Sequence, residues 1–368
     1  MEINRIGVRL LAALVFVGLL AIAASAQTPQ ITNAKTEMRA AGGSDFAAQL
    51  RDAVRTQQDA AWFGYSVAAV AGDHQMCCGS YEDGQMIGCG ACRLEDKNSG
   101  MSMHSGTSSD SRAVKLEGPQ QLVVMLRAEH GTVGRIRTFS EDCQLDAGGL
   151  PVIWFTGVSG SASVAALTPF VTSSSDADGD HLGNSALAAI ALTGDASADR
   201  TLETFVAPEQ PEKRREQAAF WLGAARGHAG YELLQQLARG DSSDDLRAKV
   251  AFDLYVSKDP AAVDEMIRMA KTDQSSHVRG QAIFWIAQKA GRKAVPAITD
   301  AIENDPNTEV KKRAVFALSQ LPREEGVPLL ISVAKTNANP AVRKQAMFWL
   351  GQSHDPRALA FFEQVLAR

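Results

Sequence analysis

Five ten-residue segments decide the fold of the C-terminal half of this chain. They read RREQAAFWLG, LRAKVAFDLY, VRGQAIFWIA, VKKRAVFALS and VRKQAMFWLG, and they begin at residues 214, 246, 278, 310 and 342. Successive segments are 32 residues apart with no insertion, and a weaker copy, LGNSALAAIA, begins in the same register at residue 182. A constant interval of this length is typical of stacked helical repeats.

Each repeat supplies two helices. In the unit that contains VRGQAIFWIA, Val278, Ala282 and Ile286 recur at helical spacing, and VPAITDAIE at 295–303 carries a second apolar face after a turn. A unit of two short helices cannot bury its apolar face alone, so neighbouring units must stack. The sequence therefore predicts a mainly α chain in which residues 181–368 form an α-solenoid of six helix pairs.

The repeats resemble a known family. The stretches VRGQAIFWIAQ and VRKQAMFWLGQSHDPRALAFFEQVL are similar to HEAT-type repeats, specifically the short phycobilisome-lyase HEAT-like kind, over about residues 181–368. The resemblance implies a helical solenoid that binds other proteins, with no shared chemistry. One family member, deoxyhypusine hydroxylase, holds iron with His-Glu dipeptides, but here His228, His277 and His354 are followed by Ala, Val and Asp. We therefore expect neither that iron site nor any cofactor.

Composition and charge narrow the function classes. The 368 residues are 45% hydrophobic and 21% charged, which is ordinary for globular domains and excludes a disordered chain. The formal net charge is −5, so nothing favours nucleic acid or an anionic membrane as the partner. The G-x-S-x-G, H-E-x-x-H, P-loop and dinucleotide-binding motifs are missing from the sequence. We expect a non-enzymatic scaffold that binds another protein.

The first residues predict the compartment. Residues 1–26 combine Arg5 and Arg9, an apolar stretch at 10–23 and the small-x-small sequence Ala24-Ser25-Ala26. This pattern is typical of a cleaved secretory signal peptide, and the apolar stretch is shorter than the ~20 residues that a membrane-spanning helix needs. We expect an exported protein, periplasmic or extracellular, that does not contact the membrane after cleavage.

A different kind of domain precedes the repeats. Residues 27–43 are polar and predict a flexible leader, and residues 44–171 predict a small α+β domain that resembles no family known to us. Its helix, near 44–57, would bury Phe46, Leu50 and Val54. Its strands are expected at 61–70, 121–127, 134–140 and 151–158, the middle two as a hairpin. Residues 172–180 are expected to be a solvated hinge, because their alternating Asp residues lack the Gly and Glu of a calcium loop.

Five cysteines lie in this domain, namely Cys77, Cys78, Cys89, Cys92 and Cys143. In an exported protein, such clustering favours structural disulfides, and the odd number leaves at least one thiol over. Two alternatives stay open: a zinc site, to which His74 could contribute, and a redox motif in the Cys-x-x-Cys sequence at 89–92. Either would make the protein a redox- or metal-responsive module in which the cysteine cluster senses and the solenoid transmits.

Two charged columns follow the repeat. The basic column is Arg215, Arg247, Arg279, Lys311 and Arg343, and the largely acidic column six residues earlier is Glu209, Asp241, Asp273, Asp305 and Asn337. The basic column could bind a partner. The interpretation that we favour is structural: each cation pairs with the acidic residue and with free backbone groups at a helix start, and so joins one repeat to the next.

One aromatic column is less expected. It consists of Phe220, Phe252, Phe284, Phe316 and Phe348. At 100° per residue these side chains point away from the centre of the core, whereas Trp221, Trp285 and Trp349 point toward it and are expected to be packing residues. Either neighbouring first helices bury the Phe side chains, which we favour, or the column forms an apolar ridge that binds a partner.

The last helix is unusually apolar. The chain ends in AFFEQVLAR, with Phe361, Phe362, Val365 and Leu366 in that helix. The terminal units of solenoids normally present a polar outer face. We therefore expect the C-terminal repeat to be covered, either by the cysteine-containing domain folding back or by self-association with a second copy.

Overall fold

We describe the protein from a computed structural model. It describes residues 29–72, 74, 76–77, 79–82, 85–89, 92–96, 120–173 and 181–367. The expected signal peptide and most of the expected hinge at 172–180 lie outside these residues. Among the described residues, no helix combines the length and the apolarity needed to cross a bilayer.

A five-stranded sheet forms the centre of the N-terminal domain in the described part of the chain. Its order is β2 (Thr36–Ala40), β10 (Val152–Thr156), β3 (Ala61–Ala68), β7 (Gln121–Glu129) and β8 (Thr132–Ser140). Strand β10 runs parallel to β2 and β3, whereas β3, β7 and β8 are antiparallel neighbours. All four strands expected from the sequence are present. The β7–β8 hairpin turns at His130 and Gly131, which both have positive φ, as a type I′ turn requires.

Both faces of this sheet are covered. On one face, α1 (Phe46–Thr56) buries Phe46, Leu50 and Val54, as its spacing predicts. On the other face, Trp62, Met125 and Trp154 pack with residues of a small sheet made of β1 (Ile31–Thr32), β9 (Leu145–Asp146) and β6 (Cys92–Arg93). A separate pair, β4 (Gly79–Glu82) and β5 (Gln85–Cys89), completes the described strands.

The flexible leader expected at 27–43 is wrong where the structure describes it. Ile31–Thr32 and Thr36–Ala40 are strands, and the second pairs with β10 along its whole length. The side chains of β2 are mostly exposed, because an edge strand joins its sheet through backbone hydrogen bonds. Its polar composition therefore concealed a strand.

The expected hinge does not separate two independent bodies. A helix that the sequence pattern did not show, α2 (Gly160–Thr172), packs against α1 and against α3 (His181–Leu192), and α3 in turn packs against β8. The backbone nitrogens of Val70 and Gly194 donate across the junction to Leu192 and Ala68, each at 2.8 Å. One hydrophobic core runs from Phe46 to Phe361, so the sheet and the repeats fold against each other.

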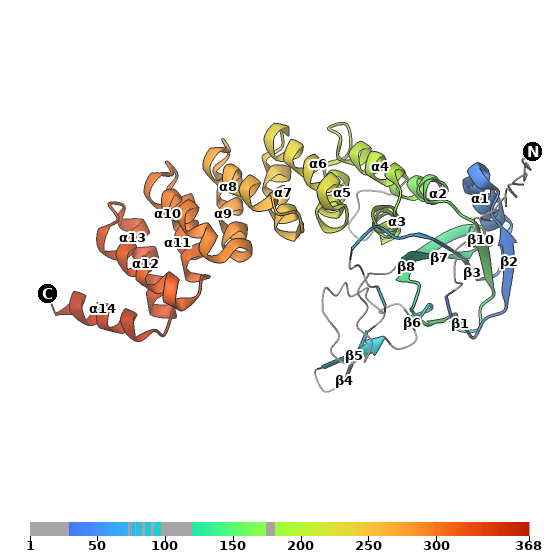
Figure 1. Ribbon diagram of the computed structural model, residues 1–368, viewed down its shortest axis with the longest axis horizontal. Coiled ribbons are helices and arrows are strands. Elements are labelled where there is room, and N and C mark those ends of the chain that lie inside the picture. Colours follow the sequence, from blue (N-terminus) through green and yellow to red (C-terminus); the bar gives the residue numbers. More distant parts are fainter. Residues whose placement is uncertain are drawn as a thin grey trace, which may run out of the picture.

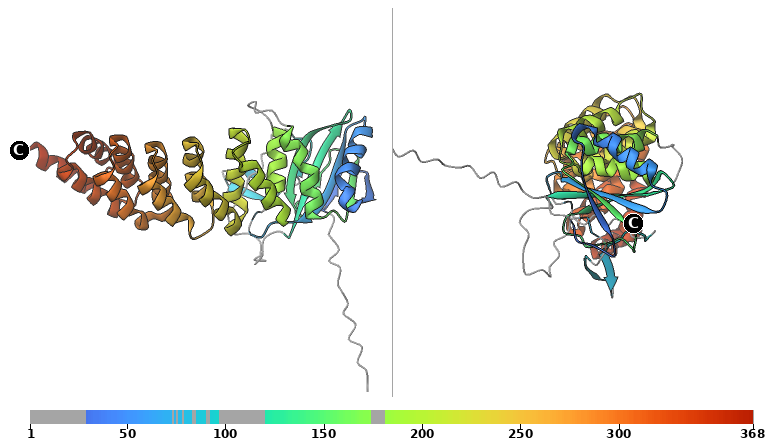
Figure 2. Two further views of the ribbon diagram at one scale, coloured as in Figure 1. Left: turned by 90° about the horizontal axis from the view of Figure 1, so that it is seen from above. Right: turned by 90° about the vertical axis from the view of Figure 1, so that its right-hand side faces the viewer.

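The repeat array follows as a row of antiparallel helix pairs (Figures 1 and 2). The described residues form six pairs: α3 with α4 (Ala196–Val206), α5 (Glu212–Ala225) with α6 (Gly227–Gly240), α7 (Asp244–Val256) with α8 (Ala262–Thr272), α9 (Ser276–Ala290) with α10 (Val295–Asn304), α11 (Thr308–Ser319) with α12 (Arg323–Thr336), and α13 (Pro340–Gln352) with α14 (Pro356–Leu366). A short 3-10 helix, η2 (Gly291–Ala294), connects the two helices of the fourth pair. The fold is mainly α, as the sequence predicts, with a smaller α+β domain at one end.

Helix α14 lies at the end of the array farthest from the sheet (Figure 1). The N-terminal domain therefore does not fold back over the last repeat, and this part of the sequence-based expectation is wrong. The first unit packs against the sheet, so the N-terminal domain is held at the opposite end of the array from the last repeat.

Stacking makes a quantitative prediction about one repeat position. Ile302 in α10 is 1% exposed, and Leu366, at the same position two units later, is 86% exposed. Ile302→Ala should lower the free energy of unfolding by ~2–5 kcal/mol, because it leaves a cavity between units. Leu366→Ala should change it by less than about 0.5 kcal/mol, as exposed substitutions do. Urea unfolding at low protein concentration measures both, and equal losses would contradict burial by stacking.

Candidate protein-interaction surface

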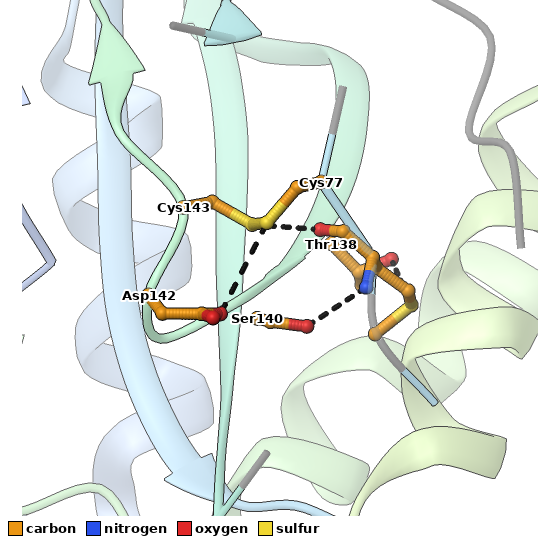
Figure 3. The surroundings of a disulfide bond; sticks show 6 residues. Cys77, Thr138, Ser140, Asp142 and Cys143 are labelled. Carbon is orange, nitrogen blue, oxygen red and sulfur yellow. Dashed lines mark hydrogen bonds between the residues drawn. A yellow bond between two sulfur atoms is a disulfide. The ribbon is translucent and has the colours of Figure 1, made fainter. Parts of the chain in front are cut away.

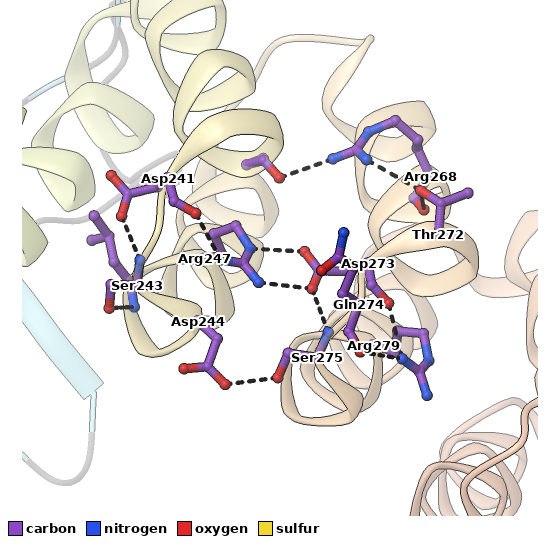
Figure 4. Close-up of polar contacts among 12 residues, drawn as sticks. Asp241, Ser243, Asp244, Arg247, Arg268, Thr272, Asp273, Gln274, Ser275 and Arg279 are labelled. Carbon is purple, nitrogen blue, oxygen red and sulfur yellow. Dashed lines mark hydrogen bonds and ion pairs between the residues drawn. The ribbon is translucent and has the colours of Figure 1, made fainter.

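The basic column binds carboxylates inside the array. The Arg247 guanidinium donates to the Asp273 carboxylate from Nε at 2.9 Å and from Nη2 at 3.0 Å (Figure 4). Its Nη1 donates to the carbonyl oxygen of Asp241 at 2.7 Å. Arg279 repeats this arrangement with Asp305 and with the carbonyl oxygen of Asp273. Each arginine thus joins the backbone of the residue that precedes its own helix pair to the carboxylate of the residue that follows that pair.

The direction of pairing differs from the sequence-based expectation. We expected each cation to pair with the acidic side chain six residues earlier, but Arg247 binds only the backbone of that residue and takes the carboxylate that lies 26 residues later. Arg215 is likewise paired with Asp241. Burial on its own would raise the pKa of Asp273, but hydrogen bonds from Arg247 and from the Ser275 backbone outweigh it and lower that pKa. These charges are engaged within the stack and are not available to a partner.

We call the basic column with its bound carboxylates the arginine ladder. Its last two members, Lys311 and Arg343, make different contacts. Lys311 donates to the carbonyl oxygen of Glu303 at 2.7 Å, and Asn337 stands where a carboxylate would receive it. Arg343 keeps the backbone contacts, since its Nη1 donates to Asn337 at 2.8 Å and to Ala338 at 3.0 Å. Its Nε and Nη2 have no acceptor in the described part of the chain.

The aromatic residues of the first helices form one continuous row, which we call the aromatic strip. Its members are Phe220, Trp221, Phe252, Tyr255, Phe284, Trp285, Phe316, Phe348 and Trp349. All are half-buried except Phe348, which is 53% exposed. The strip crosses α5, α7, α9, α11 and α13, so it runs through five of the described units.

The rings alternate between two kinds of contact. Phe220 stacks on Phe252 with ring centroids 6.2 Å apart, and Phe284 stacks on Phe316 at 5.9 Å. Between these pairs, Trp285 contacts Phe252 at 4.7 Å. Trp349 contacts Phe316 in the same way at 4.8 Å. A tryptophan in every second unit therefore closes the gap between neighbouring Phe pairs.

The structure lies between the two sequence-based interpretations of the Phe column. Neighbouring helices cover part of each ring, but the column remains at the surface. The expectation for Trp221, Trp285 and Trp349 is only half right, because they contact the core yet keep part of their surface exposed. Their alternation with Asp253 and Ala317 at the same repeat position is visible in the sequence and marks them as members of the strip.

Polar side chains border the strip at helical spacing. Arg313 lies three residues before Phe316 and Lys344 four residues before Phe348, and both are exposed with no acidic partner among the described residues. On the other side, Gln288, Gln320 and Gln352 follow Phe284, Phe316 and Phe348 by four residues and are exposed as well. The surface can bind apolar or aromatic side chains, acidic groups and peptide amides.

Asp253 follows Phe252 of the aromatic strip, and its side chain is buried. It is 2% exposed, and its Oδ2 has no hydrogen-bond partner in the structure. Helix α5 passes close by at Gly223, where an added Cβ would lie 2.4 Å from the carbonyl oxygen of Asp253. Burial raises the pKa of Asp253 well above its ordinary value, Glu216 raises it further and Lys249 partly opposes this shift. Burial of Asp253 therefore favours the protonated form of its carboxyl.

The cysteines whose side chains the structure describes, Cys77, Cys92 and Cys143, belong to the N-terminal domain. Cys77 and Cys143 form a disulfide, flanked by Asp142 and Ser140 (Figure 3). Cys77, Asp142 and Cys143 place ligand atoms within 4.8 Å of one another, but both sulfurs are bonded to each other and neither is a thiolate. Cys92 is also disulfide-bonded. The side chains of Cys78 and Cys89, and with them the expected Cys-x-x-Cys motif, lie outside the described residues.

Comparison with known proteins agrees with this fold. A family model described as HEAT repeats matches residues 295–368, which span α10 to α14, and confirms the resemblance there. A search of curated proteins gives no match.

Solved structures with similar folds include human deoxyhypusine hydroxylase, with 15% identity, a TM-score of 0.30, and coverage of 56% of this chain and 90% of that one. The CpcE–CpcF complex of phycocyanin lyase from Nostoc has 23% identity, a TM-score of 0.33, and coverage of 42% and 99%. Kap121p bound to Pho4p has 13% identity, a TM-score of 0.34, and coverage of 56% and 26%. These similarities are too low to carry an argument about function.

Asp253 predicts an unusual dependence of stability on pH. The unfolded chain loses this proton near the ordinary pKa of 3.8, whereas the folded protein loses it only at a higher pH. The free energy of unfolding should therefore fall as the pH rises above 3.8, until the carboxyl of the folded protein also ionises. Asp253→Asn cannot titrate and should reduce this slope, while the exposed Asp264→Asn should keep it. Urea unfolding across this range measures the slope, and equal slopes in all three proteins would contradict the burial argument.

Proposed function

We propose that this protein is an exported, non-enzymatic scaffold that binds another protein along the aromatic strip. The observation that carries the proposal is the strip itself. Soluble proteins rarely expose long contiguous apolar surfaces without a partner, and aromatic residues are enriched at protein interfaces. The resemblance of these repeats to HEAT-type repeats supports the same interpretation, because it implies a solenoid that binds other proteins.

Charge supports a protein partner over nucleic acid. Of the basic column, Arg215, Arg247 and Arg279 are engaged with aspartates inside the array. A phosphate backbone is bound chiefly by available cations, and this column offers few. The exposed Arg313 and Lys344 instead fit isolated acidic side chains beside the apolar contacts of a polypeptide.

Export rests on the sequence of residues 1–26, and the disulfides support it. Disulfides persist in oxidising compartments and are rare in the cytosol. They also weigh against the alternative of a redox- or metal-responsive module, because Cys77, Cys92 and Cys143 are already bonded. No observation on the described residues favours that alternative.

Thiol counting tests the structural interpretation of the cysteines, and the identity of the first residue tests cleavage of the signal peptide. Protein taken from the exported fraction and alkylated at once should show one free thiol or none. Its N-terminus should be Gln27 if the signal peptide is cleaved as proposed. Four or five free thiols with stoichiometric zinc would overturn the structural interpretation of the cysteines.

Site-specific photocrosslinking tests the binding surface. A photoreactive phenylalanine analogue in place of Phe316 should give one discrete protein adduct in the cells that export this chain. The matched control carries the analogue in place of Ile331, a half-buried apolar residue on the second helix of the same unit. Phe284→Gln should then reduce the yield of the Phe316 adduct by about tenfold, which corresponds to about 1.4 kcal/mol of binding energy. Equal adducts at both positions, or none at Phe316, would contradict the proposal.

A further inference from the structure

The first helices that carry the aromatic strip follow a pattern that repeats every second unit. Four residues before each tryptophan of the strip stands a glutamine, whereas the two units without a tryptophan carry a cation at that position. These cations are Lys249 in α7 and Arg313 in α11, and they lie two units apart. Equivalent positions of a stacked array have equivalent neighbours, so the surroundings of the two cations can be compared directly.

Lys249 has a carboxylate partner in the preceding unit. Its Nζ forms an ion pair with Glu216 of α5. The residue equivalent to Glu216 in the unit before Arg313 is Gly280 of α9, which has no side chain to offer. Arg313 is exposed, and it has no acidic partner in the part of the chain that the structure describes. The same register therefore holds a neutralised cation at one junction and an open one at the other.

The Arg313 side chain lies in the space that Gly280 leaves. A Cβ added to Gly280 would lie 2.7 Å from Cδ and 2.8 Å from Nη1 of Arg313, so the guanidinium rests against the backbone of α9. Glu309, one turn earlier in α11, forms its ion pair with Lys312. Arg313 belongs to the interior of the array, because α9 and α13 flank α11 on both sides.

This open cation borders the aromatic strip. Phe284 lies one turn after Gly280 on α9, and Phe316 lies three residues after Arg313 on α11. The two rings stack with their centroids 5.9 Å apart, and both are half-buried. A guanidinium beside a ring pair and against a helix backbone is shielded from water on these sides. Such shielding strengthens an ion pair with an incoming carboxylate, which can accept two parallel hydrogen bonds from a guanidinium.

We propose that Arg313 binds an acidic side chain, aspartate or glutamate, of the protein that lies along the aromatic strip. This inference rests on the proposed function and adds to it the chemistry of one contact. The partner's carboxylate takes the place that Glu216 takes at Lys249. An apolar side chain next to it in the partner packs on the rings of Phe284 and Phe316. The contact fixes the register of the partner on the strip, because the other cation of the two-unit pattern already has its carboxylate.

Photocrosslinking from position 316 tests the contact in the cells that export this chain. The main variants are Gly280→Glu and Gly280→Gln, which add side chains of the same shape and differ in charge. Gly280→Glu recreates at Arg313 the ion pair that Glu216 makes with Lys249, so it should lower the yield of the adduct by about tenfold. Gly280→Gln adds the same bulk without the charge and should lower the yield by less than about threefold.

Removal of each cation is a second measurement, and it does not depend on how well the Gly280 variants fold. Arg313→Gln should lower the adduct yield by about tenfold, because the partner's carboxylate loses its cation. Lys249→Gln is the matched control, since it makes the same change at the cation that already has a carboxylate, and it should alter the yield by less than about twofold. Thermal unfolding of each purified variant checks that the array is intact.

The outcomes separate this inference from the proposed function. No adduct at position 316 with the natural Gly280 and Arg313 overturns the proposed function, and the contact at Arg313 with it. An adduct that responds equally to Gly280→Glu and Gly280→Gln, or equally to Arg313→Gln and Lys249→Gln, overturns the contact alone. Mass spectrometry of the adduct should place the crosslinked residue of the partner within about four residues of an aspartate or glutamate, because each residue of an extended segment spans about 3.3 Å. A crosslinked segment without an acidic residue also overturns the contact.

Discussion

The whole molecule depends on one constraint: a pair of short helices cannot bury its apolar face without a neighbour. Residues such as Ile286 and Leu318 are fully buried only because units stack on both sides. The constant repeat interval places equivalent residues at equivalent positions. Any favourable contact between two units is therefore repeated along the array, and both the arginine ladder and the aromatic strip are such repeated contacts.

The same constraint explains why the two ends differ. The first unit also needs cover, and strand β8 of the five-stranded sheet and helix α2 supply it. The sheet in return gains a helix on its apolar face, so neither part is complete without the other and one core passes through both. The last unit has no such cover in the described chain, and its apolar positions remain exposed.

The sequence could predict what repeats and what alternates, and little else. The 32-residue interval established the helix pairs, and short apolar runs located β3, β7, β8 and β10. Strand β2 was not predicted, because pairing through backbone hydrogen bonds leaves no apolar pattern in the sequence. Helix α2 escaped because apolar residues surround it on several sides and blur its period. The aspartate that each arginine binds depends on how units stack, and spacing within one unit does not contain that information.

Charged and aromatic columns serve opposite purposes although both follow the same repeat. A buried arginine–aspartate pair loses much of its Coulomb energy to desolvation, so its main effect is to fix how units align. The ladder therefore acts on the alignment of the units and leaves few charges for a partner. An aromatic ring is stabilised by packing against a neighbouring ring, and its other face remains available for contact with a partner. The surface proposed to bind a partner is therefore one that stacking leaves incomplete, namely the aromatic strip along the array.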